Sequence, residues 1–151
     1  GKAFYTQGIN FYYAEDYVPA VDSFSKAAAM GNVSAQYYLG FMYYNGRGVA
    51  RDYAQAAYWY RKAADAGNSS AQNNLGLMYR QGLGVAQDDD DAYYWFYKAA
   101  KAGSSSAQFN LGMMFEHGWG VAEDEDEAMA WYRKAAQNGH EHAKKHLLRL
   151  Q

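Results

Sequence analysis

The sequence predicts an all-α solenoid of stacked antiparallel helix pairs, and two observations support that fold class. Residues 71–106 recur almost position for position at a constant offset of 36, as residues 35–70 and as residues 107–142. Self-similarity with a period of about 20–50 residues is typical of stacked supersecondary units and not of one globular core. Within each copy, apolar residues recur at helical spacing in two successive segments. We therefore interpret residues 1–151 as one elongated array.

The first helix of the middle copy is predicted over residues 71–81. Asn68 or Ser70 can cap its start through a side-chain oxygen, and serines equivalent to Ser70 recur in the other full copies. Gly82 can end the helix in the left-handed conformation. Its apolar face, at the i, i+3 and i+4 spacing of one helical side, consists of Leu75, Met78 and Tyr79.

The second helix of the middle copy is predicted to begin after Asp88, whose side chain can serve as the N-cap. Carboxylates at residues 89–91 fill its first turn, and Lys98 and Lys101 lie near its end, so charge complements the helix dipole at both ends. Gly103 follows as a stop signal. The predicted buried stripe consists of Ala92, Phe96 and Ala99.

The two ends of the sequence depart from the repeat. Residues 1–34 form a variant copy that is four residues shorter between its helices, where the other copies carry Gly-x-Gly-Val. An N-cap at Asp16 places Pro19 in the first turn of the next helix, where no intrahelical N–H bond is lost. Residues 143–151 match only the start of a copy. We expect them to form a capping helix that covers the last pair through Leu147 and Leu150.

Composition narrows the classes of partner. A formal net charge of −2 gives no electrostatic footprint for nucleic acid or for an anionic membrane. No apolar run reaches about 18 residues, so no membrane insertion is expected. The absence of cysteine excludes disulfides and thiolate sites, and leaves the redox compartment open. The 16 tyrosines are more than the packing of small helices requires, which favours a recognition surface.

The repeated residues form a pattern that resembles a known family. Three consecutive matches over residues 35–142 are similar to the Sel-one-like repeat family, a relative of the tetratricopeptide repeats, and residues 1–34 resemble the plainer tetratricopeptide form. The resemblance implies a right-handed superhelix that acts as a non-catalytic protein-interaction scaffold without a cofactor. It also implies a bacterial protein of the envelope, the periplasm or the exterior, although the residues themselves leave the compartment open. In the second copy the matching residues are Ala35, Leu39, Gly40, Tyr43, Gly46, Gly48, Val49, Asp52, Ala56, Trp59, Tyr60, Lys62, Ala63, Ala64 and Gly67.

Comparison of the copies with one another indicates where a partner would bind. Positions shared by all copies are most simply structural, whereas positions that differ are free for recognition. On the first helices the differing positions fall at i, i+4 and i+7, so each set forms one stripe. In tetratricopeptide arrays the corresponding stripe lines the concave groove. The predicted partner-binding residues are Tyr5, Ile9, Tyr12, Tyr37, Phe41, Tyr44, Asn73, Leu77, Arg80, Phe109, Met113 and Glu116.

The N-terminal half of this stripe is aromatic, which suits recognition because tyrosine offers a large contact area with little rotamer entropy to lose. We expect a peptide or protein partner to dock its apolar anchors there. The alternative is that these aromatic residues pack between repeats or cover an exposed end. For the whole chain, two other interpretations stay open: a self-associating structural module, as a monomer or weak oligomer, and a regulatory fragment of a longer protein.

Trp119 is a separate candidate. It lies between two glycines, where the other copies place Arg47 and Leu83, so packing does not dictate its identity. Both an exposed contact residue and a ring that lies against the adjacent helix are consistent with the sequence.

Two clusters resemble metal sites without meeting their requirements. The four carboxylates of residues 88–91 lack the alternating ligands, turn glycine and distal glutamate of a calcium loop. His140, His142 and His146 form the second cluster. His142 and His146 stand at i and i+4 beside Glu141 and could share a zinc ion, but no general base or pocket accompanies them. No nucleophile with a paired histidine and acid is present, and no phosphate-binding loop. We therefore expect no metal, no cofactor and no enzymatic activity.

Overall fold

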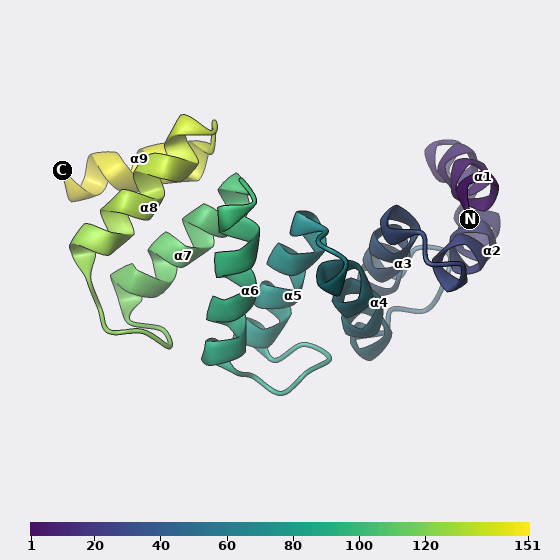
Figure 1. Cartoon of the computed structure of the whole chain (residues 1–151), viewed down its shortest axis with the longest axis horizontal. Helices are drawn as coiled ribbons and strands as arrows, with labels where there is room; N and C mark the ends of the chain where they lie inside the picture. Colours follow the sequence, from purple (N-terminus) through teal and green to yellow (C-terminus); the bar gives the residue numbers. More distant parts are fainter.

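In the computed structural model, residues 1–151 form nine α-helices and no strand, which confirms the predicted all-α class. The helices follow one another along a curved path, and each packs against the helix before it and the helix after it (Figure 1). Their bounds are α1 (Lys2–Tyr13), α2 (Tyr17–Ala29), α3 (Val33–Asn45), α4 (Tyr53–Asp65), α5 (Ser69–Gln81), α6 (Asp89–Lys101), α7 (Ser105–His117), α8 (Glu125–Gln137) and α9 (Glu141–Leu150).

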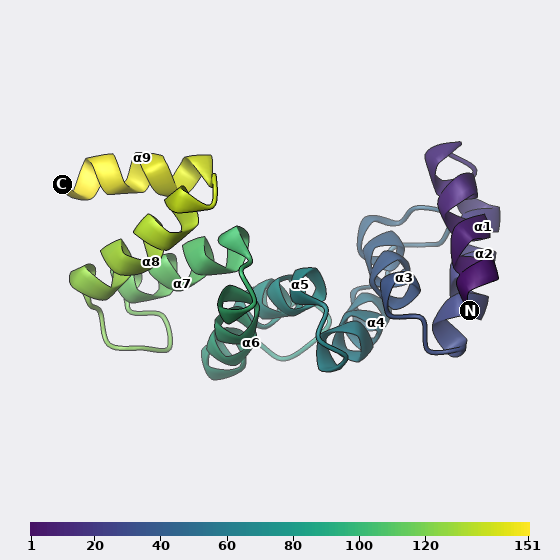
Figure 2. The same cartoon turned by 45° about the horizontal axis from the view of Figure 1, so that its top comes forward.

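The helices form four pairs, α1–α2, α3–α4, α5–α6 and α7–α8, and α9 packs against α8. In the turned view the array bends, and α3 and α5 lie on the inner side of that bend relative to α4 and α6 (Figure 2). The buried apolar residues fall into four separate clusters, each formed mainly by the second helix of one pair and the helix that follows it. This string of small cores is the predicted solenoid organisation. None of the nine helices combines the length and the apolar character that crossing a membrane requires.

Within each pair, a glycine of the first helix lies directly against an aromatic ring of the second helix. A Cβ atom on any of these four glycines would lie between 2.4 and 2.7 Å from the nearest ring atom, well inside van der Waals contact. The four rings are at most 2 % exposed. The missing side chain therefore sets the separation of the paired helices. The contacts are Gly8 with Phe24, Gly40 with Tyr60, Gly76 with Phe96, and Gly112 with Tyr132.

Two further glycines fix the turn inside each full copy. Gly82 ends α5 in the left-handed conformation, with φ of 71°, which confirms the predicted stop. At Gly84, whose φ is 72°, a Cβ would lie 2.2 Å from the carbonyl oxygen of Tyr53 in the preceding pair. Only glycine permits this approach of two backbones. The turn therefore locks its own pair onto the one before it.

The first helices begin two residues earlier than predicted. Asn68 caps α5, and its Oδ1 atom accepts a hydrogen bond of 2.8 Å from the backbone N–H of Ala71. The alternative cap, Ser70, is wrong because this serine lies inside the helix, where its backbone is already helical. Equivalent caps are Asn32 and Ser104. Asp88 caps the second helix of the middle copy, as predicted, and Asp52 and Asp124 do the same in the other full copies.

A buried glutamine joins successive pairs in the same way at three places. The Nε2 atom of Gln72 donates a 3.1 Å hydrogen bond to the carbonyl oxygen of Ala64. That carbonyl belongs to the last turn of α4 and also accepts a 3.0 Å hydrogen bond from the backbone N–H of Gly67, beyond the end of the helix. The glutamine thus adds a second hydrogen bond to this carbonyl and ties α5 to the end of the preceding helix. The other two bonds run from Gln36 to Ala28 and from Gln108 to Ala100, both at 3.2 Å.

The variant copy has the short turn that the sequence predicts. Residues 14–16 alone separate α1 from α2, and Glu15 adopts a left-handed φ of 62°. Asp16 occupies the N-cap position of α2, but its side chain accepts no backbone hydrogen bond. Pro19 lies in the first turn, as expected. At the other end α9 begins at Glu141, two residues before the predicted start.

Substitution of Gly76 by alanine is expected to lower the free energy of unfolding by about 1–2 kcal/mol. Alanine is the better helix former by about 1 kcal/mol, but overpacking against a buried ring costs about 1–3 kcal/mol. The contact at 2.6 Å puts this site at the upper end of that range. Urea denaturation followed by circular dichroism measures the change, with Ser70→Ala on the exposed side of α5 as the matched control.

The same contact predicts coupling between the two positions. In a Gly76→Ala background, Phe96→Leu removes the ring that clashes and should destabilise the chain less than it does in the wild type. If the effects of the two substitutions on the free energy of unfolding simply add, the ring of Phe96 is not the reason that residue 76 is glycine.

Candidate functional site

The predicted stripe lies on the odd-numbered helices α1, α3, α5 and α7. Eleven of its twelve residues are half-buried and one is buried, so each of the eleven packs on one side and stays accessible on another. Six of the stripe residues line two cavities between successive odd-numbered helices. We call the surface formed by these six the odd-helix groove: Phe41, Tyr44, Leu77, Arg80, Phe109 and Met113.

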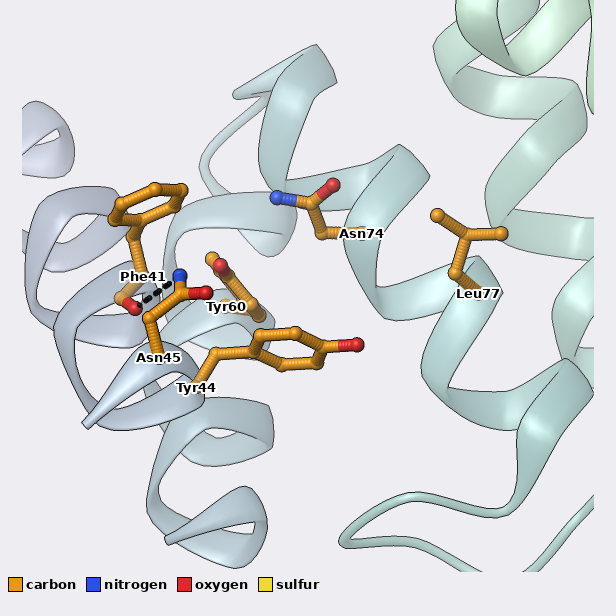
Figure 3. A pocket seen from close by; sticks show the side chains of 6 residues that line it. All are labelled: Phe41, Tyr44, Asn45, Tyr60, Asn74 and Leu77. Carbon is orange, nitrogen blue, oxygen red and sulfur yellow. Dashed lines mark hydrogen bonds between the residues drawn. The ribbon is translucent and has the colours of Figure 1, made fainter. Parts of the chain in front are cut away.

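The first cavity lies between α3 and α5 and has a volume of about 210 Å³. Phe41 and Tyr44 of α3 face Leu77 and Asn74 of α5 across it (Figure 3). The ring of Tyr60, from α4, also lines it, and burial raises the pKa of that phenol above its ordinary value. An apolar side chain of a ligand would therefore meet three rings and two amide-bearing residues, because Asn45 completes the lining.

The second cavity lies between α5 and α7 and is larger, about 410 Å³. Leu77 lines both cavities, so the two are adjacent along the array. Its wall combines apolar side chains with the guanidinium of Arg80, and the Nε atom of that guanidinium is buried without a hydrogen-bond partner. Besides stripe residues, the lining includes Gln81, Phe96, Asn110, Met114 and Trp119.

Trp119 reaches this cavity from the turn between α7 and α8. The guanidinium carbon of Arg80 lies 3.8 Å from the centroid of the indole, and His117 stacks on the same ring at 4.6 Å. Arg80 also lies 3.6 Å from a carboxylate oxygen of Asp89. The tryptophan therefore packs against the adjacent helix and lines the cavity at once.

The turn of copy two makes the corresponding contact with copy one. Arg47 donates a 2.8 Å hydrogen bond to the hydroxyl of Tyr12, and its guanidinium carbon lies 5.5 Å from the ring centroid of Phe41. In both places the residue between the two turn glycines meets the third stripe position of the preceding copy. The sequence analysis does not predict this pairing, although both of its positions differ between copies. Arg47 meets Tyr12 in one place, and Trp119 meets Arg80 in the other.

Several predicted residues serve packing. Asn73 is only 8 % exposed, and its Oδ1 atom accepts a 2.8 Å hydrogen bond from Asn110, so its assignment to the binding surface is corrected. Tyr5 and Ile9 pack against the cluster between α2 and α3 and line no cavity. The ring of Tyr37 lies 5.9 Å from that of Tyr60, and it lines no cavity either.

The last stripe residues are partly covered by α9. Glu116 accepts hydrogen bonds of 2.9 Å from Arg149 and 3.0 Å from the hydroxyl of Tyr132, so this carboxylate is already occupied within the chain. Phe109 stacks on His140 at 4.6 Å while it also lines the second cavity. Glu116 is therefore engaged within the chain, and Phe109 stays a predicted contact residue that also packs on His140.

The acidic cluster and the histidine cluster, which resemble metal sites, each contain a side chain that caps a helix. Asp88 accepts the backbone N–H groups of Asp90 and Asp91 at 2.9 and 3.1 Å, as an N-cap does. The Nδ1 atom of His140 accepts the N–H of Ala143 and so caps α9. Burial and the neighbouring imidazoles lower the pKa of His140. No group of three or more histidine, cysteine or acidic side chains is arranged to hold a metal ion.

Comparison with known proteins places this arrangement among bacterial repeat proteins. The family model described as Sel1 repeat matches residues 33–68, 69–104 and 105–140. A protective antigen of uropathogenic Escherichia coli with an SLR fold is 42 % identical over 91 % of this chain, with a TM-score of 0.88. A Sel1 repeat protein from Oxalobacter formigenes is 34 % identical over 95 % of the chain, also with a TM-score of 0.88. Cysteine rich protein B of Helicobacter pylori is 31 % identical over 58 % of the chain, with a TM-score of 0.56.

The matched part of this chain covers 30 % of the E. coli antigen, 59 % of the Oxalobacter protein and 66 % of the Helicobacter protein. No curated protein sequence matches it. The matched repeats begin two residues before the copies defined by sequence, at the first residues of α3, α5 and α7.

The Arg80–Trp119 contact is expected to contribute about 1 kcal/mol of coupling free energy, since a cation over an indole contributes about 0.5–2 kcal/mol depending on burial. A double-mutant cycle with Arg80→Ala and Trp119→Leu, read by urea denaturation, measures it. The exposed Lys62–Tyr58 pair, at 5.4 Å, is the control and should couple less. Coupling at Arg80 no larger than in that control would contradict the contact.

We expect Glu116 to make a contribution to the free energy of unfolding that depends on pH. Burial alone would raise its pKa, but the hydrogen bonds from Arg149 and Tyr132 outweigh burial and lower the pKa below its ordinary value. A carboxyl whose pKa is lower in the folded state stabilises fully above its unfolded pKa of about 4.3. That stabilisation is lost as the pH falls through the folded value.

Glu116→Gln should therefore lower the free energy of unfolding by about 1 kcal/mol at pH 7, because Arg149 is half exposed and partly screened. The difference from the wild type should shrink near pH 3. Thermal melts at both pH values measure it, and a deficit that is equal at the two would contradict the assignment.

Proposed function

This chain belongs to the Sel1 repeat family, and we propose that it is a non-catalytic scaffold that binds a peptide or protein partner along the odd-helix groove. Proteins built from these repeats generally serve as scaffolds for protein–protein contact. We propose the odd-helix groove as the place of binding because of the residues that line it.

One observation carries the proposal: the two cavities are adjacent and are lined largely by residues that differ between copies. Leu77 belongs to both. Its equivalents in the neighbouring copies are Phe41 and Met113, which also line a cavity. By contrast, the glycines and rings that hold the helix pairs together recur in all copies as glycine and aromatic residue. The array therefore keeps its stacking residues constant and varies the residues that a ligand would meet.

The lining indicates the chemistry of the ligand. The first cavity would accept an apolar or aromatic anchor between Phe41 and Tyr44 on one side and Leu77 on the other. Further along, the buried Nε–H of Arg80 lacks an acceptor, and a ligand oxygen could supply one. An extended segment with an apolar anchor followed by a carbonyl or carboxylate oxygen fits both cavities.

The polar side chains that line the two cavities are four amides, one guanidinium, two phenols and one indole, those of Asn45, Asn74, Gln81, Asn110, Arg80, Tyr44, Tyr60 and Trp119. Such groups bind and orient a ligand through hydrogen bonds, and a peptide main chain offers matching donors and acceptors.

Selection of peptides from a random library displayed on phage tests the groove against ligands of any sequence. We expect selected peptides to carry an aromatic or aliphatic anchor. Their affinity, measured by isothermal titration at a concentration where light scattering gives the monomer mass, should fall at least about tenfold in a Phe41→Ala, Leu77→Ala variant. Each truncation removes apolar contact from the centre of the site.

The matched control is a Val18→Ala, Leu148→Ala variant, because both of these side chains are more than two-thirds exposed and lie outside the groove. It should bind the peptides as the wild type does. Full affinity in a folded Phe41→Ala, Leu77→Ala variant would remove the groove as the binding site.

A further inference from the structure

The second helices of the three full copies carry a further regularity that one of them breaks. In copies two and three, a tryptophan stands three residues before the recurring lysine of the second helix, and a tyrosine directly precedes that tryptophan. The tyrosines are Tyr58 in α4 and Tyr94 in α6. The equivalent residue of α8 is Ala130, although the following Trp131 and Lys134 are retained.

Where the tyrosine is present, it makes the same contacts twice. The rings of Tyr58 and Trp59 meet edge to face at 5.0 Å, and those of Tyr94 and Trp95 do so at the same distance. The ammonium nitrogens of the following lysines lie 5.4 and 5.2 Å from the centroids of the two tyrosine rings. Lys98 also donates a 3.3 Å hydrogen bond to the hydroxyl of Tyr94.

Where the tyrosine is missing, the surface is hollowed. A cavity of about 310 Å³ lies at this position on α8, lined by Glu127, Ala130, Trp131, Arg133, Lys134 and Gln137. The ammonium of Lys134 lies 5.3 Å from the centroid of Trp131, much as Lys98 lies 5.6 Å from that of Trp95. The indole and the cation that hold a tyrosine in the other copies are therefore in place without the phenol ring.

The cations at this hollow have no carboxylate partner within the chain. Neither Arg133 nor Lys134 takes part in any of the ion pairs of the structure. Lys134 is free to lie over an aromatic face and to donate to a hydroxyl, as Lys98 does. The exposed alanine leaves one side of the hollow open to solvent.

We propose that the Ala130 hollow binds a tyrosine side chain of a partner protein, in the position that Tyr58 and Tyr94 occupy in the other copies. The chain's own tyrosines serve as the template for the ligand: its ring would meet the indole edge to face and lie near the ammonium. Its hydroxyl would accept a hydrogen bond from Lys134, as that of Tyr94 does from Lys98. An aliphatic side chain would fill the space but would gain neither the cation–π contact nor the hydrogen bond.

This site is independent of the odd-helix groove. Its residues all belong to α8, whereas none of the residues that line the two groove cavities does. Loss of one site therefore leaves the other intact, and the two proposals fail separately.

The test uses N-acetyl-L-tyrosinamide as the probe and the indole Nε1–H signals of the ¹⁵N-labelled full chain as the readout. We expect a saturable shift at Trp131, and smaller shifts at Trp59 and Trp95, whose sites are already filled. N-acetyl-L-leucinamide at the same concentrations should shift Trp131 far less.

Two variants sharpen the test. Ala130→Tyr fills the hollow with the residue that the other copies carry, and should weaken the response of Trp131 at least about tenfold. Tyr94→Ala opens the equivalent hollow in α6, and should add a response at Trp95 while that of Trp131 persists. The result for Tyr94→Ala does not depend on whether the Ala130→Tyr variant folds, so either variant alone tests the proposed tyrosine site.

The proposal is overturned if Trp131 does not respond to the tyrosine probe, if the leucine probe shifts it equally, or if folded Ala130→Tyr responds as the wild type does. It is equally overturned if Tyr94→Ala creates no response at Trp95.

Discussion

The contact between a glycine on one helix and a buried aromatic ring on its partner is the constraint on which the rest of the structure depends. Gly76 and its equivalents carry no side chain, so the rings of Phe96, Tyr132 and their counterparts lie against bare backbone. This contact fixes the distance within each pair. Gly84, pressed against the carbonyl of Tyr53, then fixes each pair on the one before. Buried residues such as Gln72, Leu75 and Met78 also recur in the full copies, so variation on the first helices falls mainly at positions outside these contacts.

Because these positions vary, the chemistry of the surface differs from one helix pair to the next. Where α3 meets α5 the cavity is aromatic, and where α5 meets α7 it contains the guanidinium of Arg80 beneath Trp119. The turns contribute to the same surface, since Arg47 and Trp119 each reach back to the preceding copy. A solenoid thus divides its residues between stacking, which repeats, and lining, which does not.

The sequence predicts the repeat, the helix pairs and most caps, because each depends on local chemistry at a fixed period: Asp88 caps α6 and Gly82 ends α5 as expected. It predicts the lining less well. Asn73 has the spacing of a groove residue, but a hydrogen bond from Asn110, a residue 37 positions away, holds it inside. Glu116 is taken by Arg149 of α9. Such contacts between distant residues leave no trace in helical spacing, and comparison of copies cannot detect them.

The proposed groove depends on stacking that leaves the residues between successive odd-numbered helices available to another chain. A crystal structure of this chain with a bound peptide tests this directly. We expect the peptide to lie between α3, α5 and α7, with an apolar side chain in contact with Leu77 and an oxygen near the Nε atom of Arg80. A peptide bound elsewhere, with Phe41, Tyr44 and Leu77 uncovered, would contradict it.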